Sequence, residues 1–483
     1  MKTGFGYPVA GLGTHLAVLA WLAAAWASVG AQGDLIQDAA RAMGALNLQS
    51  IQYSGSGSSF TVGQAPGPGA PWPRFELTKY VASVNYAPPL MREETVRRDV
   101  DFPPRGGGAG PFNPATGQGG MRPIPGDVIQ NVVRNGRNDA SLVQIWMTPH
   151  GFLKGAMANK AKVKGRTISF AVGKHIVTGT LNDQNLVESV ETLLANNVLG
   201  DVPVMAVFSG YKDYSGIRFP SRILQTQAGH ATLDLTVGDV QPNSTAANEL
   251  TLSTRPAAAP PALPPVKTEP EKIADGVWFL DGGAPMSVLV EFSDHVVIIE
   301  APQSDERTDA TIAAVKQLLP SKPIRYVVNT HQHFDHSGGV RGYVAAGIPI
   351  VTHEKNKPYW ERILANPFTL EPDRLTRSGR KAVIEAVGEK RVLSDSSMTL
   401  ELHHLQGNLH DETLLVAYLP KQKLLVQADA FHPRPGAKPL ASPPPFTVNL
   451  VENIRRLKLD VERVVHLHGG IDSMATVVKA AGG

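Results

Sequence analysis

The order of apolar and polar residues predicts one helix and then a long run of strands in the first half of the chain. Residues 34–46 place apolar side chains at helical spacing, and short strand-like runs follow, bounded by Gly, Asn and Pro. The strands expected from these runs cover residues 50–53, 75–86, 167–170, 175–181, 204–211 and 231–237. Two stretches between them, residues 63–73 and 103–126, are so rich in Gly and Pro that we expect loops there.

Residues 210–243 have the rhythm of consecutive antiparallel strands joined by turns that contain Gly. Together these features predict a β-rich (α+β) N-terminal domain over residues 32–254. Its pattern loosely resembles the curved sheets of the periplasmic lipoprotein-carrier proteins. That resemblance implies a half barrel that binds an apolar ligand. Binding of a partner in the cell envelope is a separate possibility for this domain.

A proline-rich segment, residues 255–271, separates this part from a second one with a different pattern. Because proline removes a backbone donor and fixes φ, the segment is expected to be an extended interdomain linker. Beyond it, residues 276–300 predict a hairpin, residues 309–319 a helix and residues 324–329 a buried strand. Strands that alternate with helices are typical of an α/β layered domain, which we expect over residues 272–483.

The first residues have the pattern of a secretory signal peptide. Lys2 is followed by an apolar run over residues 16–26 and by small residues at 29–31, so cleavage is expected after Ala31. The apolar run is shorter than the roughly 20 residues that a helix needs to span a bilayer. We therefore expect residues 1–31 to be removed and the mature chain to be exported without an integral membrane segment, to the periplasm if the source is a Gram-negative bacterium.

Composition and charge narrow the classes of partner. The 483-residue chain carries 46 Lys and Arg against 43 Asp and Glu, a balance that argues against a nucleic-acid surface. A small-molecule substrate is the expectation instead. There are no cysteines, so disulfides, thiolate nucleophiles and iron–sulfur sites are excluded, and any metal must be held by histidines and carboxylates.

Residues with the chemistry of metal ligands crowd into one short stretch. Directly after the predicted strand 324–329, within six positions, come His331, His333, Asp335 and His336. In a tight loop the first two imidazoles can reach one metal while the acid and imidazole that follow point to a second. Ten of the 15 histidines lie in the last third of the chain, which favours a metal site over solvated loop histidines.

The sequence here resembles the metallo-β-lactamase superfamily, whose motif H-x-H-x-D-H is complete at residues 331–336. Three further segments are similar to later elements of that family: GNLHDETLLVAYLP at residues 407–420, KLLVQADAF at 423–431 and RVVHLHGG at 463–470. The resemblance implies a four-layer αββα sandwich for the C-terminal domain.

The same resemblance implies two zinc ions held by one set of side chains. His410 would be the third ligand of the first metal, Asp429 a bridging ligand and His468 a ligand of the second metal. The full implied set is His331, His333, Asp335, His336, His410, Asp429 and His468. Iron is the alternative metal, because sites built from His and Asp accept it readily.

Some residues depart from the family's pattern or compete with the implied ligands. Asp411 follows the implied third ligand, where the family commonly has Thr. The rival imidazoles are His403, His404, His432 and His466. His403 or His404 could take the place of the third ligand, and His466 shares the strand face of His468, two residues further on.

The chemistry that these residues predict is hydrolysis. Zinc held by neutral imidazoles and carboxylates lowers the pKa of a bound water from 15.7 to about 7. The metal-bound hydroxide, oriented by Asp335, would attack an ester, thioester, lactone, amide or β-lactam bond. Asp429 resembles the bridging ligand of glyoxalase-II-like hydrolases rather than the lactamase groups. Two other functions stay open: an iron-dependent oxidoreductase of the same superfamily, similar to persulfide dioxygenases, and an N-terminal protein that binds apolar ligands and carries an accessory metal domain.

Overall fold

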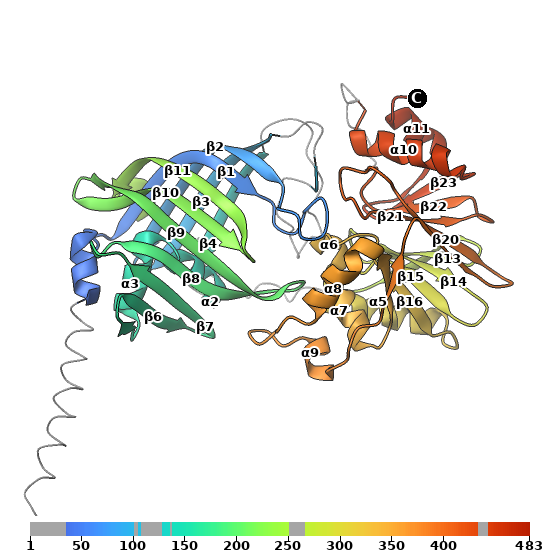
Figure 1. Ribbon diagram of the computed structural model, residues 1–483, viewed down its shortest axis with the longest axis horizontal. Coiled ribbons are helices and arrows are strands. Elements are labelled where there is room, and N and C mark those ends of the chain that lie inside the picture. Colours follow the sequence, from blue (N-terminus) through green and yellow to red (C-terminus); the bar gives the residue numbers. More distant parts are fainter. Residues whose placement is uncertain (1–34, 101–104, 108–127, 136–137, 251–265, 433–442) are drawn as a thin grey trace, which may run out of the picture.

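The computed structural model describes residues 35–100, 105–107, 128–135, 138–250, 266–432 and 443–483. The predicted signal peptide, most of the predicted linker and most of the predicted loop 103–126 lie outside these residues. None of the helices in the described part is long and apolar enough to cross a membrane. Figure 1 shows a strand-rich N-terminal part and a C-terminal part of mixed helices and strands that lie end to end.

One antiparallel sheet of 11 strands forms the N-terminal part, in the order β4-β3-β2-β1-β11-β10-β9-β8-β7-β6-β5. Its strands are β1 (Ser50–Phe60), β2 (Arg74–Tyr86), β3 (Pro89–Asp99), β4 (Val128–Asn135), β5 (Lys162–Lys164), β6 (Thr167–Val172), β7 (His175–Leu181), β8 (Val187–Asn196), β9 (Gly200–Tyr214), β10 (Ile217–Gln227) and β11 (His230–Pro242). Every strand segment predicted for residues 32–254 falls on this sheet. The predicted succession of antiparallel strands over residues 210–243 is β9, β10 and β11.

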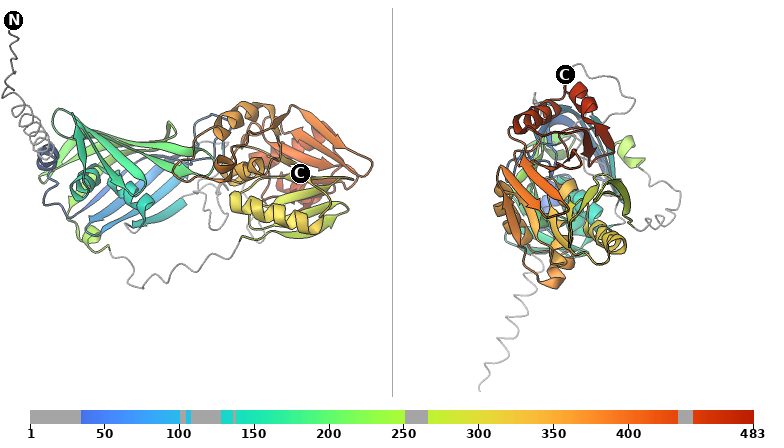
Figure 2. Two further views of the ribbon diagram at one scale, coloured as in Figure 1. Left: turned by 90° about the horizontal axis from the view of Figure 1, so that it is seen from below. Right: turned by 90° about the vertical axis from the view of Figure 1, so that its right-hand side faces the viewer.

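Helices α2 (Asp139–Trp146) and α3 (Pro149–Ala158) lie inside the curve of this sheet. Helix α2 contacts β3 and β4 near one edge and β6 and β7 near the other, so the sheet bends around it, as Figure 2 shows. Trp146 and Phe152 are buried in the core that the helices share with the sheet. The predicted first helix is confirmed over residues 35–42, and α4 (Thr245–Asn248) follows the last strand. Helices α2 and α3 escaped the sequence reasoning because eight and ten residues give too few turns to establish a period.

Two sheets form the C-terminal part. The first contains β12 (Glu269–Ala274), β13 (Val277–Asp281), β14 (Ser287–Glu291), β15 (Val296–Ile299), β16 (Ile324–Val328), β17 (Ile350–His353) and β18 (Ile384–Val387). The second contains β19 (Lys390–Ser394), β20 (Thr399–His404), β21 (Leu415–Leu419), β22 (Leu424–Gln427), β23 (Arg463–His466) and β24 (Ile471–Ser473). The helical elements are α5 (Asp305–Leu318), α6 (Phe334–Ser337), α7 (Val340–Ala345), the short 3-10 helix η1 (Glu354–Asn356), α8 (Lys357–Leu364), α9 (Arg374–Ser378), α10 (Pro445–Leu457) and α11 (Met474–Ala480).

Side chains that alternate along the strands build the layers. On β14, Val288 and Val290 enter the core between the two sheets, whereas Leu289 enters the core beneath helices α5, α7 and α8. On the far side, Leu450 of α10 and Val477 of α11 pack against the second sheet. The C-terminal domain is therefore a four-layer αββα sandwich, and the predicted fold is confirmed.

Strand β12 begins at Glu269, inside the range 255–271 that the sequence assigns to the linker. Pro270 lies on this strand and pairs with Leu280. Because β12 is an edge strand, the missing proline N–H can face away from the ladder. Regular structure thus starts before the predicted boundary at residue 272.

Two pairs of parallel strands bring the chemistry-bearing loops to one end of the sandwich. Strand β15 runs parallel to β16, and β22 runs parallel to β23. The carboxyl ends of parallel strands meet at the same edge of a sheet. Glu300 directly follows β15, His331 follows β16, and Asp429 and His468 follow β22 and β23.

Candidate metal centre

The loop after β16 holds its four ligand-type residues in a fixed turn. His331 and His333 precede α6, while Asp335 and His336 lie on it. The Ser337 hydroxyl donates to the His333 carbonyl oxygen at 2.7 Å, which tightens the turn. At Gly338 a Cβ atom would stand 1.9 Å from the carbonyl oxygen of Gln303, so only glycine fits where the chain leaves the loop.

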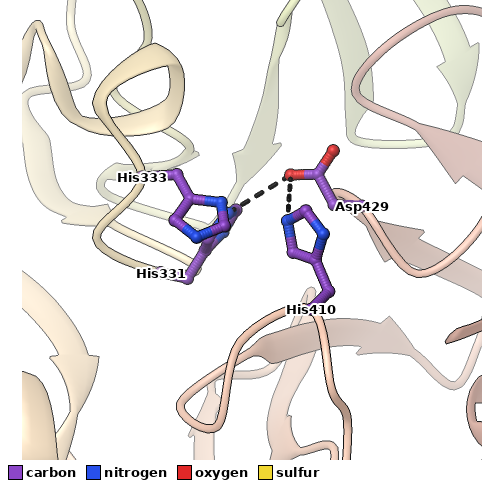
Figure 3. Close-up of side chains that lie close together, drawn as sticks. All are labelled: His331, His333, His410 and Asp429. Carbon is purple, nitrogen blue, oxygen red and sulfur yellow. Dashed lines mark ion pairs between the residues drawn. The ribbon is translucent and has the colours of Figure 1, made fainter. Parts of the chain in front are cut away.

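Four side chains form a first group of ligand atoms, all within 4.8 Å of one another: His331, His333, His410 and Asp429. Figure 3 shows the three imidazoles and the carboxylate turned toward a common point. Asp429 Oδ2 lies 3.2 Å from His331 Nε2 and 3.3 Å from His410 Nε2. These residues come from loops after β16, β20 and β22, so the group joins both sheets.

Asp335, His336 and His468 form a second group beside the first. Asp429 also faces this group, with Oδ2 at 2.7 Å from His336 Nε2 and Oδ1 at 2.9 Å from His468 Nε2. Asp335 Oδ2 lies 3.5 Å from His336 Nε2. The structure thus brings all seven residues selected from the sequence together, in two groups with Asp429 between them.

The first group fits a cation. His331 Nε2, His333 Nδ1, His410 Nε2 and Asp429 Oδ2 are buried and make no hydrogen bond of normal geometry, and the ion-pair neighbours of Asp429 Oδ2 are imidazole nitrogens. A buried polar atom without a partner is costly, and four that face one point are rare unless a bound group satisfies them. Imidazole nitrogens and carboxylate oxygens are the ligands that zinc takes in proteins without cysteine.

The electrostatics of the site suit that interpretation. Burial holds the pKa of His333 well below its ordinary value and lowers the pKa of His410 to about 4, so both rings are neutral and offer a lone pair. Burial also raises the pKa of Asp429, but the surrounding imidazoles, His336 first, outweigh it and hold that pKa well below its usual range. Neutral imidazoles beside an ionised carboxylate are the protonation states that metal binding requires at the first group. At the second group burial lowers the pKa of His336, but the carboxylates of Asp429, Asp335 and Glu300 outweigh it and hold that pKa well above its ordinary value, so a metal there would displace a proton from this ring.

The family comparison agrees with this geometry. Residues 280–468 match the family model described as the metallo-beta-lactamase superfamily. The C-terminal domain belongs to the metallo-beta-lactamase superfamily.

Individual relatives cover parts of the chain. A stretch of 74 residues is 32% identical to the alkyl/aryl-sulfatase BDS1 of Saccharomyces cerevisiae, which is 15% of this chain and only 12% of that protein. A metallo-beta-lactamase from Pontibacter korlensis is 20% identical, with 45% of this chain and 98% of that one covered at a TM-score of 0.34. Rubredoxin oxygen:oxidoreductase from Desulfovibrio gigas is 16% identical, with 44% and 59% covered at a TM-score of 0.35.

The rival histidines named from the sequence divide into two kinds. His403 Nε2 pairs with Glu401 at 2.9 Å, and His404 Nε2 donates to the Glu412 carbonyl oxygen at 2.9 Å. His466 Nδ1 lies 2.9 Å from the side chain of Gln427. These three rings lie outside both groups of the metallo-beta-lactamase domain. His432 lies next to the two groups of ligand atoms, with its Nε2 atom 3.2 Å from Asp429 Oδ1.

Glu300 is a buried residue of the site that the sequence reasoning missed. Its Oε2 accepts from the Thr330 hydroxyl at 2.5 Å and from His336 Nδ1 at 2.9 Å. The Thr330 hydroxyl in turn lies 3.0 Å from His331 Nδ1. Glu300 therefore orients one imidazole of each group, directly for His336 and through Thr330 for His331, so that the Nε2 atom of each ring faces Asp429. The feature of the sequence that could have indicated Glu300 is its position, as an acidic residue directly after the apolar run that forms β15.

We predict that Glu300→Gln weakens metal binding by about 10- to 100-fold, the usual cost of losing such an outer partner. The substitution keeps the size of the side chain but exchanges a carboxylate oxygen that accepts from His336 for an amide. Competition against a chromophoric chelator measures the affinity. Glu361→Gln is the matched control, because Glu361 lies exposed on α8. Equal affinities in the two variants would contradict this role for Glu300.

A cavity of about 470 Å³ opens next to the metal site, between the two parts of the chain. Its lining includes Ala65, Trp72 and His230 from the N-terminal part and Gln332, Tyr359 and Arg362 from the metallo-beta-lactamase domain. Gln332 lies between two residues of the first group in sequence, so the cavity adjoins the loop that carries them. The cavity has room for a small molecule.

Proposed function

We propose that the metallo-beta-lactamase domain is a hydrolase that works with two zinc ions. The observation that carries the proposal is the set of four buried ligand atoms that face one point without hydrogen bonds. The donors are nitrogen and oxygen atoms, without sulfur, and zinc accepts such a set. When bound, such ions lower the pKa of a coordinated water and polarise the bond to be cleaved.

In this proposal the chain's own residues hold and orient the reacting groups. Asp429 faces both groups and so fixes their separation. Asp335 Oδ2 lies at the second group, 3.7 Å from His468 Nε2, where a carboxylate can orient the nucleophile and accept its proton. The side chains of the seven residues are at most 5% exposed, and charges act more strongly where water is excluded.

The bond cleaved is proposed to be that of an ester, thioester, lactone, amide or β-lactam. We add sulfate esters to this range because of the short match to an alkyl/aryl-sulfatase. We further propose that residues 1–31 direct export, to the periplasm in a Gram-negative source. The substrate is then a small molecule of the cell envelope or its surroundings.

A screen of the zinc-loaded full chain tests the proposal. The substrates are p-nitrophenyl acetate, p-nitrophenyl sulfate, an acyl thioester and nitrocefin. We expect turnover of at least one of them to fall by about 100-fold or more in His331→Ala. His403→Ala serves as the matched control, since that ring pairs with Glu401 outside both groups. Turnover that His331→Ala leaves unchanged would argue against hydrolysis at this site.

A further inference from the structure

The N-terminal part reaches into the metal site through one loop. Residues 61–73, here called the cover segment, connect β1 to β2 and lie beside α6 (Figure 1). Gly63 O accepts from Phe334 N at 3.2 Å, and Pro66 O accepts from Glu412 N at 2.9 Å. The cover segment therefore bonds to two of the three loops that supply the first group of ligand atoms, the loop after β16 and the loop after β20.

Gln64 of the cover segment contacts Asp335 directly. Its Nε2 donates to Asp335 Oδ1 at 2.9 Å, and both side chains are buried. A carboxylate can only accept here, so the amide nitrogen must face it. With Oδ1 occupied, Oδ2 is the oxygen that faces His336 and His468. Gln64 thus decides which oxygen of Asp335 is presented to the second group.

The next residue, Ala65, acts on the first group. Its carbonyl oxygen accepts from His333 Nε2 at 2.8 Å and from Gln332 Nε2 at 3.1 Å. A proton on Nε2 leaves Nδ1 as the unprotonated nitrogen, and His333 Nδ1 is a buried atom without a hydrogen bond. The carbonyl therefore fixes the tautomer and the direction of this ring.

A second set of contacts locks the N-terminal sheet to the metal-site domain. Asp201, the second residue of β9, accepts from Thr369 N at 2.7 Å and from the Thr369 hydroxyl at 2.6 Å. Leu199 O accepts from Asn366 Nδ2 at 2.8 Å. The cover segment is consequently held from two sides, by its own contacts and by the sheet that carries it.

We propose that the cover segment is an outer shell of the metal centre, in which Gln64 is a positioning residue for Asp335 and Ala65 O positions His333. The inference rests on the proposed function, because it assumes that the two groups hold metal. Its consequence is that the second metal is held at full strength only when the N-terminal part supplies Gln64. Loss of the Gln64 amide then weakens one metal position and leaves the other in place.

The test uses the full chain loaded with Co²⁺, with Gln64→Ala and with Gln64→Met, which keeps the length of the side chain but has no N–H. Stopped-flow release of metal to an excess of chelator is followed, and visible absorption of Co²⁺ reports each position. We expect one of the two metals to leave about 10- to 100-fold faster in both variants and the other to leave at the wild-type rate. The matched control is Gln184→Met, because Gln184 is exposed in the turn between β7 and β8.

Release at the wild-type rate in Gln64→Met would overturn the inference and leave the proposed function standing. A wild-type chain that binds no metal would overturn both. Melting curves identify any variant that has lost its fold. Because Gln64→Met fills the space of the glutamine, its result separates loss of the hydrogen bond from loss of packing.

Discussion

Asp429→Ala is expected to lower turnover by at least about 100-fold, more than the loss of an outer partner costs. The carboxylate lies within 3.3 Å of imidazole nitrogens in both groups. Its removal therefore deprives both groups of the negative charge that they share. Two metal ions would then be held with one carboxylate fewer, so their mutual repulsion would be screened less and the second ion would bind more weakly. Steady-state kinetics under saturating zinc measure the effect.

Two further variants make that result interpretable. Asp429→Asn keeps the shape of the side chain but removes its charge, and we expect it to behave like Asp429→Ala. Asp183→Asn is the control, because its carboxylate is fully exposed in a turn of the N-terminal sheet. Activity in Asp429→Asn within a few fold of the wild type would mean that the charge of this residue does not serve the reaction.

Removal of metal is expected to lower the melting temperature of the chain by roughly 10 °C. The ligand atoms come from loops on both sheets and meet only in the folded chain. A bound ion therefore stabilises the folded state and not the unfolded state. A ligand at 1,000 times its Kd contributes about 4 kcal/mol, and each kcal/mol corresponds to about 2–4 °C in a domain of this size. Differential scanning calorimetry with and without a chelator measures the shift.

The Asp429→Asn variant is the internal reference for the melting experiment. If metal binding causes the stabilisation, chelator should leave the melting temperature of this variant nearly unchanged. An equal shift in wild type and variant would mean that the chelator acts elsewhere on the protein. No shift in the wild type would count against a metal held tightly by these residues.

The fold of the C-terminal domain could be predicted from the sequence because its hydrophobic pattern and its H-x-H-x-D-H motif indicate the same fold. The apolar runs that become β14 and β15 are buried on both faces, and such strands appear in a sequence as continuous apolar segments. Strand β16 was predicted as a buried strand, but only its last two residues, Val327 and Val328, are buried. The N-terminal sheet was harder to predict in full. Strand β8 mixes exposed and buried positions without clean alternation, and β5 has only three residues, so neither carries a clear period.

The candidate site could be predicted where its residues lie close together in the sequence, but not where they lie far apart. His331, His333, Asp335 and His336 follow one another on a single loop, so their spacing alone suggested a shared task. Gln64 lies 271 residues from Asp335 in sequence, and nothing in a loop rich in Gly and Pro marks it as a partner. Such a contact depends on how the two parts of the chain pack, which spacing in the sequence does not encode.

The separate expectation that the N-terminal part binds an apolar ligand or an envelope partner stays a prediction. Helices α2 and α3 occupy the inside of its curved sheet, and the cover segment turns the opposite end toward the metal site. The contacts of Gln64 and Ala65 connect this part to the chemistry more directly than a tether would. A role in substrate entry fits the cavity that both parts line.

The central claim is that the two groups of side chains hold two zinc ions. Metal content of the purified full chain, by plasma mass spectrometry, tests it with wild type beside His331→Ala and Asp429→Ala. We predict close to two zinc per wild-type chain and a clear loss in both variants. Iron in place of zinc, a single metal, no metal, or an undiminished content in the variants would contradict the claim.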